Sequence, residues 1–415
     1  MARPPRPDRR VAVTGMGIKT PAGCDLDGFW RTIVAGRSCI GPIRRFDPEA
    51  LPVRFAGEVA DFDVEAYLGY KEARRADRVA QLGFGAAVDA LADAGELGAD
   101  PARCGVVAGT GVGGLITQEQ EEHELFSKGA MRVSPFLVPM MMPNATAALI
   151  GMKFGWTGPN FCVATACAAG SHSVGEGAGL VRGGSADVVL AGGTEAAVTP
   201  IAIAAFARMG ALSGRADAPE EASRPFDVDR DGFVIGEGAA FLVLEEWERA
   251  ESRGARIYGE VAGYGRNADA YHVTAPSPGG IGAAECMRLA LADAGMGAAD
   301  VGHVNAHGTS TPLNDAAEAE AVVKVFGERS LPVTSVKGST GHLIGAAGAV
   351  EAVASFLAMA HGLVPPTANH HRAEPGLAID VVAGEARPWS AAPVVSNSFG
   401  FGGHNASLVL APAGS

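Results

Sequence analysis

The chain repeats part of itself, and this repeat limits the folds that are open to it. Residues 232–244 (GFVIGEGAAFLVL) align without gaps with residues 398–410 (SFGFGGHNASLVL), and six of the thirteen positions are identical. Each stretch is a glycine-rich turn that runs into an apolar strand. A repeat of this kind predicts two similar halves packed together. We place their boundary near residue 256, so that the halves are residues 1–256 and 257–415.

Strand-like and helix-like segments alternate through both halves. Residues 104–111 (CGVVAGTG) and 186–193 (ADVVLAGG) have the short apolar pattern of buried strands, whereas residues 77–95 and 345–362 have the length and composition of helices. Alternation of this kind predicts an α/β fold with helices layered on mostly parallel sheets. In such a duplicated fold, the loops of both halves would meet at one site.

Composition excludes several kinds of protein. With 47% hydrophobic and 19% charged residues among 415, the chain is typical of a protein with a large buried core. Its net charge of −13 argues against a nucleic-acid partner, which would require a broad basic face. Because no run of eighteen apolar residues occurs, we expect no membrane span. The start, MARPPRPDRRVAVTG, lacks an apolar signal region, and we expect a soluble, cytoplasmic protein.

A dinucleotide site is the first chemistry to weigh. Gly109, Gly111 and Gly114 have the GxGxxG spacing after a strand, which can hold a phosphate on backbone N–H groups. However, a chain with 57 glycines matches this pattern readily by chance, and no strand ending in an acidic residue follows at the required distance. We therefore interpret these glycines as packing and turn residues and predict no nucleotide cofactor.

Cys167 is the second candidate. None of the six cysteines has CxxC or Cys/His metal spacing, and we interpret the other five as small buried apolar residues. Cys167 differs because it stands where a strand gives way to a helix, among small residues that leave room for a substrate. A helix amino terminus favours the thiolate. The residue is therefore a candidate nucleophile, although a core cysteine would fit the same pattern.

Two histidines of the second half could serve this thiol. His307 (NAHGTST) and His342 (KGSTGHLIG) each follow a strand among small residues, where a histidine bonded to the backbone is the ordinary alternative. With no acid resembling a triad member, a cysteine and two histidines favour carbon–carbon bond formation through a thioester over hydrolysis. Two neutral imidazoles can donate N–H bonds to an enolate oxygen. Five other histidines lack this setting, and we interpret them as surface or helix-end residues: His123, His303, His361, His370 and His371.

Four long motifs resemble those of one family. The segments ATACAAG (164–170), NAHGTSTPLND (305–315), KGSTGHLIGAAGAVE (337–351) and SNSFGFGGHN (396–405) are similar to the signatures of the β-ketoacyl-acyl-carrier-protein synthases, in their elongating type II form. The resemblance covers nearly the whole chain. It implies an acyltransferase with the thiolase-like duplicated fold in five αβαβα layers.

The resemblance also implies a mechanism. Cys167 would take an acyl group from acyl carrier protein, and malonyl-carrier protein would then lose carbon dioxide to give an enolate held by His307 and His342. The enolate would attack the acyl group and yield a 3-oxoacyl chain longer by two carbons. The backbone N–H groups of Cys167 and Phe401 would hold the oxyanion. No cofactor is expected, because the phosphopantetheine arrives on the carrier protein.

Further residues receive roles from the resemblance alone. Lys337 would support the histidines with Glu318 as its ion partner, and Phe401 would gate the site. Phe399 and Phe401 could instead alternate into the core. The substrate pocket would be lined by Thr274, Thr309, Thr311, Phe206, Val112 and Phe399.

Two surface and structural sites complete the expectations. An acidic carrier protein needs local positive charge on this acidic chain, although such charges are more often a solvated face. The cations expected to dock it are Lys71, Arg74, Arg75, Lys128, Arg132 and Arg208; Gly210 stands where relatives can carry another arginine. A structural monovalent cation would lie among Asn305, Glu351, Ser396 and Asn397. The family implies a homodimer.

Three alternatives remain open at this point. A ketosynthase of a type II polyketide pathway would use the same chemistry on another chain, although the FGFGG loop and TACAAG favour fatty-acid elongation. A chain-length partner without activity would lack the nucleophile, which Cys167 provides here. A nucleotide-dependent oxidoreductase would bind its cofactor saturably in a titration.

Overall fold

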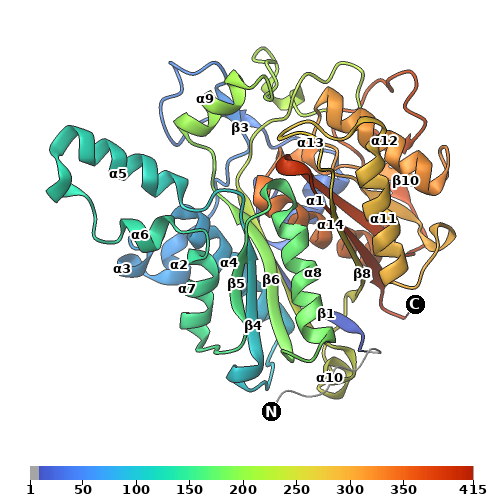
Figure 1. Ribbon diagram of the computed structural model, residues 1–415, viewed down its shortest axis with the longest axis horizontal. Coiled ribbons are helices and arrows are strands. Elements are labelled where there is room, and N and C mark those ends of the chain that lie inside the picture. Colours follow the sequence, from blue (N-terminus) through green and yellow to red (C-terminus); the bar gives the residue numbers. More distant parts are fainter. Residues whose placement is uncertain (1–8, 415) are drawn as a thin grey trace.

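The computed structural model describes residues 9–414. Within that range, eleven strands form one hydrogen-bonded sheet that consists of two half-sheets (Figure 1). The half-sheets join only where β1 (Val11–Lys19) meets β8 (Gly259–Ala268), through the pairs Ala12–Glu260 and Val13–Gly259. Each half therefore folds around its own set of strands.

The two half-sheets have the same topology. From edge to centre, the first contains β5 (Asn160–Val163), β4 (Cys104–Gly109), β6 (Val188–Glu195), β7 (Gly238–Glu246) and β1. The second contains β10 (Pro332–Thr334), β9 (His303–Asn305), β14 (Val394–Gly400), β15 (His404–Pro412) and β8, with β12 (Asp380–Val381) added outside β10. When the five shared strands of each half-sheet are numbered along the chain, with β12 left out, both half-sheets have the strand order 3-2-4-5-1. Their parallel and antiparallel pairs also match.

The sequence repeat corresponds to this duplication. β7 begins at Gly238 and β15 begins at His404, and these two residues are opposite each other in the alignment of residues 232–244 with 398–410. The proposed boundary at residue 256 falls between α10 (Trp247–Ser252) and β8. That boundary remains a prediction.

Helices cover and separate the half-sheets. α4 (Arg78–Ala94) and α7 (Ala145–Phe154) pack on the first half-sheet, while α11 (Ile281–Asp293) packs on the second, with α12 (Pro312–Phe326) beside it. Two further helices, α8 (Ala169–Arg182) and α14 (Ala347–His361), contact strands of both half-sheets and each other. The predicted five-layered αβαβα fold is confirmed.

The remaining elements lie around these layers. The helices are α1 (Leu26–Val34), α2 (Val64–Leu68), α3 (Tyr70–Ala73), α5 (Leu115–Lys128), α6 (Leu137–Met141), α9 (Pro200–Arg208) and α13 (Lys337–Thr340). Two small ribbons pair β2 (Gly41–Pro42) with β3 (Phe55–Ala56) and β11 (Leu363–Val364) with β13 (Arg387–Pro388). α5 projects away from the layered body (Figure 1).

The two central helices touch at their amino-terminal ends because glycines stand there. A Cβ atom on Gly170 of α8 would lie 2.8 Å from the backbone nitrogen of Ala349 in α14. A Cβ atom on Gly348 of α14 would lie 2.2 Å from Oγ of Ser171. Both contacts are too short for any side chain, so only glycine permits this approach. The turns that lead into α8 and α14 are thereby brought together.

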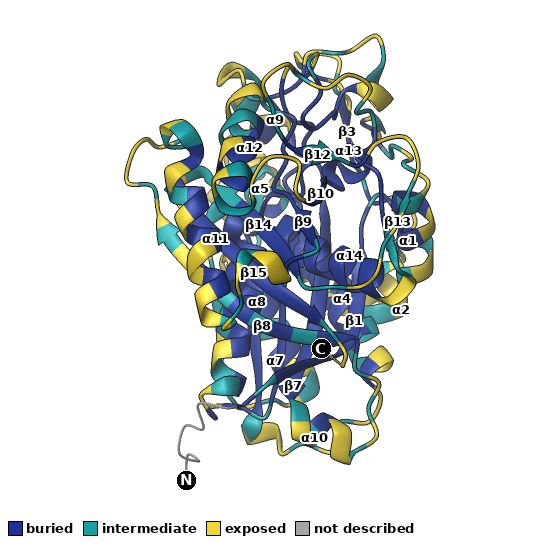
Figure 2. Cartoon of the chain, turned by 90° about the vertical axis from the view of Figure 1, so that its right-hand side faces the viewer, coloured by how far each residue is buried: buried dark blue, intermediate teal, exposed yellow. Residues whose placement is uncertain are grey.

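α14 is almost wholly buried (Figure 2). Among the described residues, Ile344–His361 is the one helical segment that is long and apolar enough to cross a membrane, and 89% of it is buried inside the protein. Its apolar composition follows from its place between two sheets, since both of its faces meet side chains of the core.

His303 corrects one expectation. It lies in β9 and is 1% exposed, so its interpretation as a surface or helix-end residue is wrong. Its ring packs edge-on against Trp389, with centroids 5.8 Å apart, and neither ring nitrogen has a hydrogen-bond partner among the described residues. Burial lowers the pKa of His303 to about 3, so this histidine is neutral.

Candidate active site

Cys167 stands on a strained turn between β5 and α8. The 3₁₀ turn Ala166–Ala168 precedes α8, and Ala166 has φ 49°, which a residue with a side chain rarely adopts. The neighbouring Gly400 leaves room for this turn, because a Cβ atom there would lie 3.2 Å from the backbone nitrogen of Cys167. The surrounding structure thus holds Ala166, the residue before the cysteine, in a costly backbone conformation.

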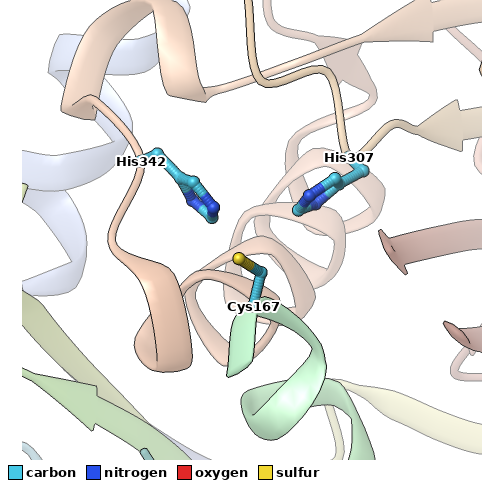
Figure 3. Close-up of side chains that lie close together, drawn as sticks. All are labelled: Cys167, His307 and His342. Carbon is cyan, nitrogen blue, oxygen red and sulfur yellow. The ribbon is translucent and has the colours of Figure 1, made fainter. Parts of the chain in front are cut away.

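The structure brings Cys167, His307 and His342 together (Figure 3). The sulfur and one nitrogen of each ring all lie within 4.8 Å of one another. The rings are nearly perpendicular, with centroids 5.3 Å apart. His307 follows β9, and His342 follows α13, so the histidines come from one half of the fold and the thiol from the other. All three residues are buried.

The thiol differs from expectation in its charge. Burial raises the pKa of Cys167 to about 11, although the backbone N–H of Phe401 and the charge of Lys337 act in the opposite direction. The prediction of a thiolate is therefore wrong, because burial disfavours the charged form more than the N–H of Phe401 and the charge of Lys337 favour it. The free protein holds a protonated thiol at neutral pH.

Both histidines are neutral. Burial lowers the pKa of His307 and of His342 well below the usual range, and the positive charge of Lys337 adds to the effect. Nδ1 of His307 lies 3.4 Å from Nζ of Lys337. Because an ammonium group only donates, Nδ1 accepts and the ring proton is assigned to Nε2. The two nitrogens of His342 have no hydrogen-bond partner in the described chain.

Lys337 and Glu318 both hold His307, but they do not form the expected ion pair. Lys337 pairs instead with Glu351 of α14 and donates a 2.5 Å hydrogen bond to the carbonyl oxygen of His307. Glu318 of α12 accepts the backbone N–H groups of His307 and Gly308, both at 2.7 Å. The prediction of Glu318 as the ion partner is therefore wrong: its oxygens are aimed at a backbone turn.

A cavity of about 460 Å³ opens onto the three residues. Besides them, the sequence-predicted residues that line it are Val112, Phe206, Thr274, Thr309, Thr311, Phe399 and Phe401. The hydroxyl oxygens of Thr309 and Thr311 lie 2.9 Å apart. Every predicted substrate residue thus lines the same cavity as the thiol.

Sequence reasoning missed Phe233. Its ring packs edge-on against His342 at 5.4 Å and against Phe206 at 5.3 Å. The repeat carried the signal, because Phe233 aligns with Phe399, whose ring packs on His307 at 6.1 Å. Each histidine therefore has one phenylalanine from an equivalent turn of the duplicated fold.

Phe401 lies in a turn that only glycine-rich sequence can form. It begins the 3₁₀ turn Phe401–Gly403 between β14 and β15, in which Gly402 has φ 84° and Gly403 has φ 72°. The N–H of Gly402 donates to the carbonyl oxygen of Val273 at 2.8 Å. Phe401 is half-buried and reaches the cavity, while its gating role remains a prediction.

The GxGxxG glycines serve packing. A Cβ atom on Gly109 would lie 2.4 Å from the carbonyl oxygen of Ala169, and one on Gly114 would lie 2.3 Å from that of Met140. The N–H of Gly111 donates to buried Glu195 at 2.6 Å. Backbone and carboxylate oxygens thus fill the space around these glycines, where a phosphate would need donors.

The cations predicted to dock a carrier protein are all exposed: Lys71, Arg74, Arg75, Lys128, Arg132 and Arg208. Arg75 lies 4.6 Å above the ring of Phe136, and Lys128 pairs with Glu124 within α5. Arg208 ends α9 beside Met209 and Gly210, which line the cavity. Lys153, which sequence reasoning missed, pairs with Glu72 of α3.

Three of the four predicted cation ligands offer free oxygens. The side-chain atoms Oδ1 of Asn305, Oε2 of Glu351 and Oγ of Ser396 are buried without a partner in the described chain. Ser396 pairs with Asn305 between β14 and β9. Oδ1 of Asn397 already accepts from Ser407 at 2.8 Å, so it differs from the other three oxygens, and the role of Asn397 stays a prediction. Hard oxygen ligands suit a monovalent cation better than a soft metal.

Fold and site together define a thiolase-like condensing enzyme, in which a buried cysteine of one half faces two neutral histidines of the other. The chain belongs to the β-ketoacyl synthase family: the family's N-terminal domain matches residues 8–250 and its C-terminal domain matches residues 258–371. The predicted resemblance is confirmed.

Several similar proteins match this chain over nearly its whole length. A 3-oxoacyl-[acyl-carrier-protein] synthase 2 of Synechocystis is 48% identical over 408 residues, covering 97% of this chain and 98% of the relative. The protein of the same name in Vibrio cholerae is 45% identical, and the match covers 97% of this chain and 99% of that relative. Among solved structures, the ishigamide ketosynthase/chain length factor superposes with a TM-score of 0.92 at 38% identity, covering 98% of this chain and 100% of that one.

The raised pKa of the thiol predicts how Cys167 reacts. Its alkylation by iodoacetamide should accelerate about tenfold per pH unit between pH 7 and 9, because the thiolate fraction grows at that rate below a pKa of about 11. Mass spectrometry of the peptide that contains Cys167 measures the rate. A rate that is already constant between pH 6 and 8 would show that the free protein holds a thiolate.

Proposed function

We propose that this β-ketoacyl synthase elongates fatty acyl chains on acyl carrier protein, by decarboxylative Claisen condensation with malonyl-acyl carrier protein. One observation carries the proposal: a thiol and two neutral imidazoles converge within 4.8 Å at a largely apolar cavity. The thiol provides covalent attachment, and the imidazoles provide uncharged N–H donors. A hydrolase would need a base oriented by a carboxylate, and neither ring nitrogen of His307 or His342 bonds to one within residues 9–414.

The first half-reaction needs a base, because the thiol is protonated. His342 would act as this base, since neither of its nitrogens has a hydrogen-bond partner within residues 9–414 and one carries a lone pair. Cys167 loses its proton to His342 and its sulfur attacks the thioester carbonyl. When the tetrahedral intermediate collapses, the carrier's thiolate leaves and takes the proton from His342. The acyl group is then held on Cys167.

The second half-reaction uses the same rings as donors. The malonyl carbon–carboxylate bond breaks, and its electron pair forms an enolate whose oxygen accepts N–H bonds from His307 and His342. Lys337 fixes the His307 proton on Nε2, whereas no protein partner fixes the tautomer of His342. His342 can therefore present a lone pair in one half-reaction and an N–H in the other.

Carbon–carbon bond formation completes the cycle. The enolate carbon attacks the acyl carbonyl on Cys167, and the new oxyanion lies against the backbone N–H groups of Cys167 and Phe401. Both N–H groups interact with the sulfur in the free protein, which supports this role. Collapse of this intermediate breaks the carbon–sulfur bond, releases the 3-oxoacyl chain on its carrier and leaves the Cys167 thiolate, which takes up a proton from solvent.

Acylation is the first test. Incubation with acyl-carrier proteins should give one acyl adduct by intact mass, and the adduct should vanish in Cys167→Ala. Cys39→Ser, which alters a half-buried cysteine outside the cavity, is the matched control and should acylate normally. An adduct that persists in Cys167→Ala would place the nucleophile elsewhere. A preference for polyketide intermediates over saturated chains would favour the type II polyketide alternative, whose ketosynthases are among the similar structures.

The histidines should separate the two half-reactions. His307→Ala should acylate near the normal rate but condense about 10²–10³-fold more slowly, since it loses one enolate donor. His342→Ala should slow both steps, because it also loses the base. Single-turnover assays with acyl and malonyl carriers measure each step. Condensation at the normal rate in either variant would remove that residue from the mechanism.

Carrier docking is proposed at the exposed cations of α3 and its following turn. A similar solved structure is a type II polyketide ketosynthase in complex with its acyl-carrier protein, 32% identical to this chain with a TM-score of 0.90. Arg74→Glu combined with Arg75→Glu should raise KM for acyl-carrier protein at least tenfold and leave turnover of an acyl-pantetheine thioester unchanged. Equal KM values would move the docking surface away from α3.

A homodimer is proposed from two exposed features. β5 is the outermost strand of the first half-sheet, so its outer edge has free backbone groups within the described chain. The α5–α6 arm exposes large apolar side chains, among them Met131, which is 96% exposed. Pairing of two β5 edges would cover both features. Sedimentation should give twice the 42.1 kDa chain mass, and a 42.1 kDa species would contradict the proposal.

A monovalent cation is proposed among Asn305, Glu351 and Ser396, whose three buried oxygens lack partners among the residues that the structure describes. It would satisfy these oxygens and share Glu351 with Lys337, and so stabilise the support of His307. Replacing potassium and sodium with tetramethylammonium should then lower the melting temperature, and less so in Ser396→Ala. An unchanged melting temperature would contradict this site.

A further inference from the structure

We propose that the active site also binds one soft divalent metal ion, of which Zn²⁺ is the natural example, through Cys167, His307 and His342. The ligand atoms already lie within 4.8 Å of one another and point to a common centre (Figure 3). The proposal concerns the same site as the proposed function but requires only its geometry. It adds a ligand that would compete with the substrate.

The donor set is that of an open zinc site. A thiolate and two imidazoles provide three protein ligands, and soft sulfur with nitrogen selects Zn²⁺ over Mg²⁺ or Ca²⁺. With Zn–N distances of about 2.0–2.1 Å and a Zn–S distance of about 2.3 Å, tetrahedral ligands stand roughly 3.3–3.7 Å apart. The three side chains would therefore close by about 1 Å or a little more, within the range of small χ rotations.

Both histidine rings can present a nitrogen to the metal centre. His342 is 3% exposed, lines the cavity and has no hydrogen-bond partner at either nitrogen in residues 9–414, so a metal would satisfy a buried ring. On His307, Lys337 contacts Nδ1, so Nε2 faces the metal centre and must give up its proton before it can bind. Glu318 anchors the backbone of that residue. Such outer contacts orient ligands in known metal sites.

Charge at the site is compatible with a cation. Lys337 is the nearest positive group, and its ion pair with Glu351 offsets that charge. Binding replaces the S–H bond of Cys167 and the N–H bond on Nε2 of His307 with metal bonds. The thiol proton is released to solvent, and the His307 proton moves to Nδ1. The ion sheds the waters that the three side chains replace as it becomes four-coordinate, and the fourth position opens on the cavity.

The move of that proton to Nδ1 turns a donor toward Lys337, so the contact between Lys337 and Nδ1 is lost on binding. Lys337 retains its bonds to Glu351 and to the carbonyl oxygen of His307. The metal would occupy the nucleophile and both enolate donors at once. We therefore expect reversible inhibition that acyl-carrier protein relieves and that a chelator removes.

Co²⁺ is the probe, because a thiolate bound to tetrahedral Co²⁺ gives a charge-transfer band and strong visible absorption. The metal-free full chain should gain both at one equivalent, and Zn²⁺ should displace them. Cys167→Ser should lose the charge-transfer band, and His342→Ala should bind at least about tenfold more weakly. Cys39→Ser is the control for another thiol and should match the parent.

Alkylation provides a second readout. One equivalent of Zn²⁺ should protect Cys167 from iodoacetamide, and EDTA should restore its reactivity. Absence of the band and of protection, or equal Co²⁺ binding in Cys167→Ser and His342→Ala, would overturn the proposal; unchanged circular dichroism would show that the variants are folded. Acyl-adduct formation by the metal-free protein tests the proposed function separately. If the protein forms the acyl adduct but binds no metal, only the proposed metal site is overturned. If it binds the metal but forms no acyl adduct, only the proposed function is overturned.

Discussion

The close approach of α8 and α14 is the contact on which the site depends. Gly170 and Gly348 let the amino-terminal ends of these helices touch at distances that exclude any side chain. Cys167 stands just before α8 and His342 just before α14. A larger residue at either glycine would force the helices apart and separate the thiol from its partner, even though neither glycine faces the substrate. Helix packing in the central layer and catalytic geometry are therefore one constraint.

Burial then sets the chemistry of everything placed there. It raises the pKa of Cys167 to about 11 and holds both histidines neutral. A fully exposed site would give a more acidic thiol but protonated rings that carry no lone pair at low pH. The buried site reverses this: the nucleophile needs a base, and the neutral rings can be that base as well as donors. The same desolvation also weakens the imidazoles as bases, while it leaves their N–H groups uncharged for the enolate oxygen.

The repeat predicted the two packed halves, and the resemblance to a known family supplied the five layers. The expectation of mostly parallel sheets is wrong, because antiparallel pairs are as frequent as parallel ones in the large sheet. The repeat at residues 232–244 and 398–410 corresponds to β7 and β15, and the motifs around Cys167, His307 and His342 name the residues that meet. The sequence could not show which side chains become partners through the packing of distant helices. Glu318 and Glu351 are both acidic residues on helices near the site, and only the relative placement of α12 and α14 decides which one reaches Lys337. The charge of the thiol was missed for the same reason: the helix end is visible in sequence, whereas desolvation by distant segments is not.

The duplication also explains why the two histidines are not equivalent. Each has a phenylalanine from an equivalent turn, Phe399 on His307 and Phe233 on His342. Only His307 has an ammonium group at Nδ1, because Lys337 is held by Glu351 close to that ring and away from the other. One ring is thereby fixed as a donor, while the other keeps its choice of tautomer. The charge of Lys337 therefore makes the two histidines of a pseudo-symmetric fold unequal. In the proposed mechanism, the thioester exchange uses the histidine with the free tautomer as a base, and the condensation uses both histidines as N–H donors.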